Sequence, residues 1–191
     1  MKQIIPGLLA GLAALLLGPA AGAEEYHPDA LRCMTLEKPF YAWEYCSRLI
    51  HSPEMSQRDL VGVYNRRGLA LQGLEKPAQA LSDFEAAVRL LPWEARDDRA
   101  LVLVNRAQAY HALGRYDEAV EDYNSVLKLR SKKIKQAMLP KVYMLRGASY
   151  REMDREVSAL LDLQKALSLS NSPSQRRAIR RLLKEIKGEA P

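Results

Sequence analysis

Small and large residues alternate along the chain in an order that occurs three times. Spacings of three and four residues put each set on one face of a helix. The first set of each unit comprises Gly68 and Leu71, Ala107 and Tyr110, and Gly147 and Tyr150. The second set begins twelve residues later and comprises Ala80, Phe84 and Ala87, then Ala119, Tyr123 and Val126, then Ala159, Leu163 and Ala166. The pattern predicts pairs of antiparallel helices, in which small residues permit close approach and large residues fill the space between pairs.

This arrangement resembles the tetratricopeptide repeat, a helix-turn-helix unit of about 34 residues. The resemblance covers residues 61–94, 100–131 and 140–171, and Pro92 stands where the family places the proline that ends the second helix. Equivalent alanines lie 39 and 40 residues apart, so the connections between units are longer than usual. The resemblance implies an all-α protein, a right-handed α-solenoid of about three repeats.

One departure from the family pattern is systematic. Arg67, Arg106 and Arg146 stand where the family usually has leucine. They suit either a helix cap or a bridge between neighbouring helices, and the sequence does not choose between the two. Asp83, Asp122 and Asp162 recur at equal places in the second helices, which favours a structural role as partners of the arginines.

The N-terminus has the composition of an export signal. Lys2 precedes an apolar run over residues 4–17, and Ala21-Gly22-Ala23 has the small residues that a signal peptidase needs. The alternative is an uncleaved membrane anchor, but the run is shorter than the roughly 20 residues that span a bilayer. We expect residues 1–23 to be a signal peptide that is cleaved after Ala23, and the protein to be secreted or periplasmic.

Two cysteines, Cys33 and Cys46, lie early in the expected mature chain. Export to an oxidising compartment favours a disulfide between them, the alternatives being buried free thiols or one reactive thiol. Residues 24–60 are interpreted as an N-terminal arm and half repeat, because residues 39–51 have the spacing of a second helix. The disulfide-pinned segment 24–38 is expected to replace the first helix of that unit, and Trp43 is expected to belong to the core.

Residues 172–191 are expected to close the solenoid as a capping helix and tail. Ser172, Pro173 and Gln175 suit a helix start, and Gly188 suits its end. Between these limits, Ile179, Leu182, Leu183 and Ile186 form one apolar stripe opposite arginines and lysines. The alternative is a helix that lies on a membrane surface, but the stripe is narrow and lacks aromatic residues.

The net charge of +6 arises late in the chain, in two basic runs over residues 128–135 and 176–187. Export and the absence of interleaved aromatic residues argue against a nucleic-acid partner. The sequence has no phosphate-binding loop, no convincing metal-ligand spacing and no recognisable nucleophile setting. We therefore expect no enzymatic activity, no cofactor and no metal.

Functional residues are implied by the resemblance, because in this family the first helices line a groove that receives a segment of a partner. Carried over by position, the groove residues are Asn65, Leu69, Gln72, Leu101, Val104, Gln108, His111, Lys141, Met144, Ala148 and Arg151. The family's carboxylate clamp is matched only at Asn105 and Lys141, so a clamp is not expected. The alternative to a partner-binding groove is that these first-helix faces are merely solvated or are covered by the protein's own N-terminal arm.

The whole layout resembles small secreted bacterial tetratricopeptide-repeat proteins. The expected function is that of a periplasmic adaptor or scaffold that binds a partner protein or peptide segment in its groove, as in envelope assembly. The alternative is a peripheral envelope component that docks on anionic lipid or polysaccharide through its basic C-terminal surface.

Overall fold

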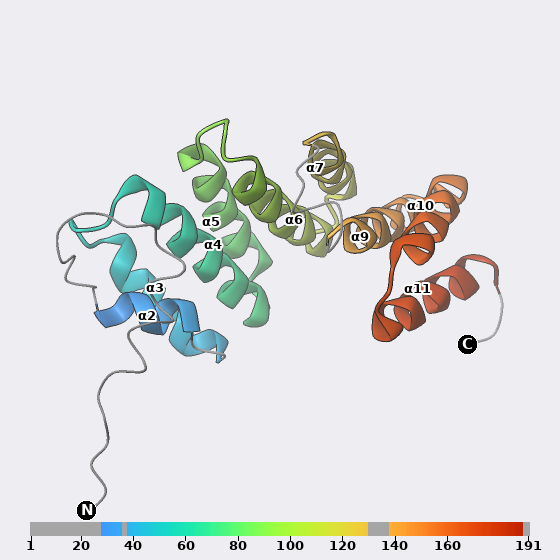
Figure 1. The fold of residues 1–191 in the computed structure, drawn as a ribbon. Helices are drawn as coiled ribbons and strands as arrows, with labels where there is room; N and C mark the ends of the chain where they lie inside the picture. Colours follow the sequence, from blue (N-terminus) through green and yellow to red (C-terminus); the bar gives the residue numbers. More distant parts are fainter. Residues whose placement is uncertain (1–27, 36–37, 130–137, 189–191) are drawn as a thin grey trace, which may run out of the picture.

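A computed structural model describes residues 28–35, 38–129 and 138–188. The expected signal peptide lies outside these residues. Within them the chain forms only α-helices, as the sequence predicted, in the order shown in Figure 1. The helices are α2 (Pro28–Thr35), α3 (Pro39–Ile50), α4 (Gln57–Gly73), α5 (Pro77–Leu90), α6 (Arg96–Ala112), α7 (Tyr116–Lys128), α9 (Leu139–Glu152), α10 (Glu156–Leu169) and α11 (Pro173–Ile186).

The helices pack as successive pairs. The three predicted repeats are the pairs α4–α5, α6–α7 and α9–α10, and each second helix also contacts the first helix of the next pair. The pairs follow one another along an arch, with α2 and α11 at its two ends (Figure 1). This confirms the all-α, paired helix-turn-helix fold.

The core lies between the helices of each pair, where the small and large residues meet as predicted. Phe84, Tyr123 and Leu163 are completely buried at equivalent positions of the three second helices. Gly68 lies so close to the ring of Phe84 that a Cβ atom there would be 2.6 Å from it. At Gly147 a Cβ atom would be 3.0 Å from Leu163. A small residue in the first helix is therefore required by the large residue opposite it.

The turns inside the three repeats share one conformation. Glu75, Gly114 and Asp154 occupy the same place in each turn, with φ of 58°, 73° and 56°. The next residue of each turn donates its backbone N–H back into the first helix, as when Arg115 bonds to the carbonyl of Tyr110 at 2.9 Å. A left-handed residue with such a bond is a common way to end a helix.

The helix ends follow local sequence signals. Ser56 accepts a hydrogen bond from the backbone of Asp59 and caps α4. Pro77 and Pro140 stand in the first turns of α5 and α9, where a missing N–H costs nothing. Ser172 caps α11, and Gly188 follows its end with φ of 67°.

The N-terminal unit corrects one expectation. Residues 28–35 of the segment that was expected to replace a first helix are themselves a short first helix, α2, which packs against α3 and α4. A signal for this was present in the sequence. Leu-Glu-Lys-Pro occurs at residues 36–39 and again at residues 74–77, where it leads from α4 into α5. The recurrence in the sequence of the four residues that lead from α4 into α5 indicates a helix on both sides of them.

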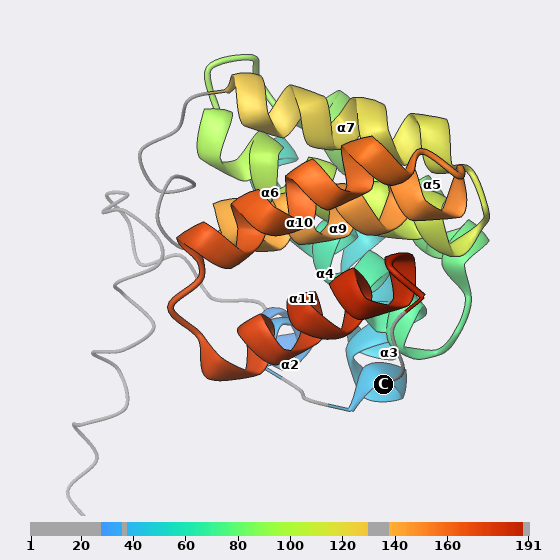
Figure 2. The ribbon, with the colours of Figure 1, turned by 90° about the vertical axis from the view of Figure 1, so that its right-hand side faces the viewer.

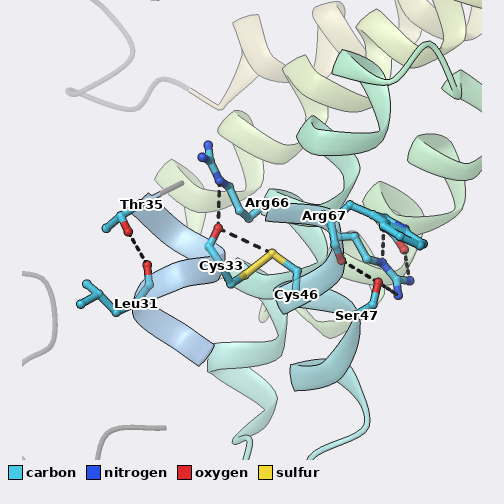
Figure 3. Close-up of a disulfide and its surroundings, with 9 residues drawn as sticks. Leu31, Cys33, Thr35, Cys46, Ser47, Arg66 and Arg67 are labelled. Atoms are coloured by element: carbon cyan, nitrogen blue, oxygen red, sulfur yellow. Dashed lines mark hydrogen bonds and ion pairs between the residues drawn. A yellow bond between two sulfur atoms is a disulfide. The ribbon is translucent and has the colours of Figure 1, made fainter. Parts of the chain in front are cut away.

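A disulfide joins α2 to α3. The Sγ atoms of Cys33 and Cys46 are bonded, and both residues are completely inaccessible to solvent. Arg66 of α4 donates a hydrogen bond to the carbonyl of Cys33 at 3.1 Å, so the unit is also tied to the first repeat (Figure 3). Trp43 is partly buried against the main core, as expected.

Candidate partner-binding face

The first helices of the successive pairs form a continuous row. Helix α2 contacts α4, α4 contacts α6, α6 contacts α9, and α9 contacts α11, whereas α3, α5, α7 and α10 do not contact one another. Seen along the stack, α7 lies at the top and α2, α3 and α11 lie at the bottom, with α6, α9 and α4 between them (Figure 2). We call the inner side of the arch, formed by α4, α6 and α9 between α2 and α11, the first-helix face.

The first helices are held to their partners by a repeated ion pair. Arg106 donates from Nε and Nη2 to the two carboxylate oxygens of Asp122, at 2.7 and 2.6 Å. The same bidentate pairing joins Arg67 to Asp83 and Arg146 to Asp162. The arginines thus bridge the two helices of one repeat, the second of the two roles that the sequence allowed. All three aspartates are buried. The pairs therefore fix the orientation of each first helix against its second helix, and with it the side of the first helix that faces away from that partner.

Polar side chains join neighbouring first helices across the row. Asn105 donates from Nδ2 to Oδ1 of Asn65 at 2.8 Å, which links α6 to α4. Nδ1 of His111 lies 2.9 Å from the hydroxyl of Ser149, which links α6 to α9. Arg151 forms an ion pair with Glu185 of α11. Three of the predicted groove residues, Asn65, His111 and Arg151, therefore help to set the spacing of the row.

Other predicted residues remain accessible on this face. Leu101, on the middle helix α6, is 43% exposed, and Lys141 on α9 is also exposed. Gln72 and Gln108 are half-buried and bond to backbone carbonyls of α6. The remaining half-buried residues are Leu69, Met144 and Ala148.

Val104 was assigned to the groove wrongly. Its side chain is 1% exposed and belongs to the main hydrophobic cluster. The residue occupies the same repeat position as Asn65 and Met144, which are both partly accessible. A short branched side chain on the middle helix is covered by its neighbours, whereas the longer side chains reach out of the same interface.

His111 has a perturbed acid–base equilibrium. It is half-buried between α6 and α9 and its ring contacts that of Tyr116, with 5.1 Å between centroids. Burial lowers the pKa of His111 below its ordinary value, because the charged form is poorly solvated there, and Arg151 adds to the lowering while Glu152 opposes it. The neutral form of the His111 ring, whose Nδ1 either accepts a hydrogen bond from the Ser149 hydroxyl or donates one to it, is therefore favoured at pH 7.

Two hollows adjoin this region. One of about 310 Å³ lies at the ends of α4 and α6 and is lined by Gln72, Glu75, Pro77 and Ala112. The other, of about 650 Å³, lies where the start of α4 meets the connection from α5 to α6, with Arg58 and Arg89 beside apolar residues. Across residues 28–35, 38–129 and 138–188, no three acidic, cysteine or histidine side chains come together as a metal site. No helix in that part of the chain is long and apolar enough to cross a membrane.

Exposed apolar residues outside the first-helix face were not singled out by the sequence. Val157 and Leu161, on the outer side of α10, are 74% and 63% exposed. Met34 of α2 is 41% exposed, and its terminal methyl group lies beside Gly62 at the edge of the first-helix face. The hydrophobic pattern of α10 gave a signal for Val157 and Leu161, because both stand opposite its buried alanines.

Comparison with known proteins agrees with this geometry. Residues 59–132 match the family model described as Tetratricopeptide repeat. The match runs from the start of α4 to just beyond the end of α7, so these two helix pairs are tetratricopeptide repeats, and α9–α10 has the same paired arrangement.

Solved structures share the fold at low sequence identity. The second TPR domain of human RPAP3, determined in complex with the HSP70 peptide SGPTIEEVD, is 20% identical and aligns over 69% of this chain and 98% of that one, with a TM-score of 0.56. TTC0263, a thermophilic TPR protein of Thermus thermophilus, is 22% identical over 76% of this chain and 73% of that one, with a TM-score of 0.56. MamA from Desulfovibrio magneticus is 14% identical over 83% of this chain and 89% of that one, with a TM-score of 0.59.

Proposed function

We propose that this tetratricopeptide-repeat solenoid is a non-catalytic scaffold that binds a short segment of a partner protein along its first-helix face. The observation that carries the proposal is the exposure of Leu101. This residue has a large apolar side chain that is 43% exposed at the centre of the row. The half-buried amides of Gln72 and Gln108 lie on α4 and α6 of the same row.

The chemistry of this face favours an amphipathic segment. An apolar side chain of the partner would cover Leu101, and backbone or side-chain polar groups of the partner would meet the amides. Lys141 adds an exposed cation on α9, which suits an acidic residue toward that end of the segment. The ion pairs inside each repeat support such binding, because a surface that is rigid beforehand loses less entropy on association.

A matched pair of leucines tests the proposal. Leu101 and Leu161 are both exposed leucines on helices, but Leu161 lies on the outer side of α10. A photo-crosslinking amino acid placed at each position in turn, in cells that produce the protein, should form an adduct with one partner from position 101 and not from position 161. Mass spectrometry of the adduct identifies the partner segment.

The affinity of the identified segment then provides a quantitative check. Leu101→Glu should weaken binding at least about tenfold while changing the unfolding free energy by no more than about 0.5 kcal/mol, because the side chain is exposed. Leu161→Glu should leave both quantities unchanged. Adducts that form equally from both positions, or only from position 161, would place the binding surface elsewhere.

We also propose that the protein acts after export, as a periplasmic adaptor in envelope assembly. The disulfide between Cys33 and Cys46 supports an oxidising compartment, and the sequence of residues 1–23 supports cleavage after Ala23. Cell fractionation followed by N-terminal sequencing tests this location. A mature chain that begins at Glu24 in the periplasmic fraction is expected, and an intact N-terminus in the cytoplasm would contradict it.

A further inference from the structure

Helix α11 and the residue after it form a strongly basic segment. The chain has a net charge of +6. Six basic residues and one glutamate between Arg176 and Lys187 give this short segment a net charge of +5. The rest of the chain sums to a net charge of +1, although it includes the second basic run over residues 128–135. Helix α11 lies at one end of the arch (Figure 1).

The packing of α11 determines which side of it faces solvent. Ile179 is completely buried against Leu163 and Ala166 of α10, with Leu182, Leu183 and Ile186 of α11 partly buried around it. Arg176 is directed back to the protein, because its Nη1 donates to the carbonyls of Leu167 and Ser170 at 2.6 and 3.0 Å. The apolar side of the helix is thus already occupied by the solenoid.

The opposite side of α11 is a stripe of exposed cations. The basic stripe consists of Arg177, Arg180, Arg181, Lys184 and Lys187. Spacings of three and four residues place these side chains on one face over three helical turns. Like charges at such spacings repel one another and destabilise a helix. The segment contains a single acidic residue, Glu185, which accepts from Arg181 at 2.9 Å. Cations therefore outnumber acidic residues on the exposed side of α11, and this side would attract a negatively charged surface outside the protein.

We propose that the basic stripe docks the C-terminal end of the protein on the surface of an anionic phospholipid bilayer. The stripe lies on the exposed side of a single helix, where it can rest against a plane of headgroups. Helix α11 has no aromatic residue on which sugars or bases could stack. Because its apolar side is buried, the helix lies on the headgroups without inserting, and the attraction is electrostatic.

Vesicle binding of the full-length mature protein tests this inference. The probe is a vesicle of phosphatidylcholine with about 30% phosphatidylglycerol, at about 0.1 M salt. Each cation near such a surface contributes about fivefold to the partition coefficient. The variant R177Q/R180Q/K184Q should therefore bind about 100-fold more weakly, whereas R177K/R180K should bind like the wild type. Salt at about 0.5 M should abolish binding by the wild type.

A charge-matched control separates the stripe from net charge. Arg58, Arg89 and Lys165 are exposed on other helices, so R58Q/R89Q/K165Q removes the same three charges and should retain most of the binding. Equal losses in both triple variants, or wild-type binding no stronger to these vesicles than to pure phosphatidylcholine, would overturn the inference. Binding of a soluble anionic polymer through the stripe without vesicle binding would also overturn it. Thermal unfolding of each variant establishes that the fold is intact.

Discussion

The repeated arginine–aspartate pairs predict a sharp effect of a nearly isosteric substitution. Asp122→Asn keeps the size of a side chain that is 8% exposed but removes its charge. It also turns one of the two acceptors that face Arg106 into a donor. The guanidinium, whose side chain is 20% exposed, then lies between the helices without its counter-charge.

The size of this effect follows from the burial of the pair. Removal of one partner from a buried ion pair costs about 3–5 kcal/mol. Because Arg106 retains some access to water, the lower value of about 3 kcal/mol is expected. For a chain of this length that loss corresponds to a decrease in Tm of about 6–12 °C. Urea titration followed by circular dichroism, with the disulfide intact, measures the loss of unfolding free energy.

Two further variants test the reasoning itself. Glu118→Gln breaks the exposed pair between Arg115 and Glu118 and should leave the unfolding free energy nearly unchanged. The double variant Arg106→Leu/Asp122→Ala removes both charges and should recover at least half of the loss. Two results would show that the pair does not join the helices as described. In one, Asp122→Asn costs no more than about 0.5 kcal/mol. In the other, the double variant loses as much stability as the single variants Arg106→Leu and Asp122→Ala lose together.

Three other predictions concern packing, pH and the disulfide. Gly68→Ala should cost about 1–3 kcal/mol, because its Cβ would meet a buried aromatic ring at 2.6 Å. Gly62→Ala in the same helix should be neutral or stabilising in the same urea titration, since it meets only the flexible end of a side chain at 3.2 Å; equal costs would contradict the predicted packing. Burial lowers the pKa of His111 in the folded protein. The unfolded state therefore takes up the proton first, and stability should fall as the pH drops below about 6.5. The slope of unfolding free energy against pH should be smaller in His111→Gln, and an unchanged slope would count against this assignment. Thiol titration of the denatured, non-reduced protein should detect neither Cys33 nor Cys46, and reduction should cost about 3 kcal/mol while most helical circular dichroism remains. Two titratable thiols before reduction would exclude the disulfide.

Local spacing was sufficient to predict the pairs and their buried residues. Ala80, Phe84 and Ala87 specify one face of a helix regardless of what lies opposite, because helical geometry alone brings residues three and four apart together. Helix ends were predictable for the same reason, since Ser56 and Ser172 cap their own helices. The partner of each arginine was also inferable, because the aspartates recur at a constant separation.

The first-helix face could be predicted only in part. Position within a repeat assigned Val104 and Leu101 equally to the groove, but one is 1% exposed and the other 43%. The difference depends on how α6 packs between α4 and α9, which involves contacts between residues about 40 positions apart. Helical periodicity gives the direction of a side chain relative to its own axis and contains no information on how closely the next helix approaches.

The sequence by itself thus determined the helices of the three repeats and the last helix, the apolar face of each and the places of the two basic runs, because these properties depend on near neighbours along the chain. Only the tertiary structure decided that residues 28–35 pack against α3 and α4, that Val104 is buried, and that the apolar side of α11 is occupied while its basic stripe faces outward. These outcomes depend on the spacing between helices, which is set by the combined volumes of residues that are distant in sequence.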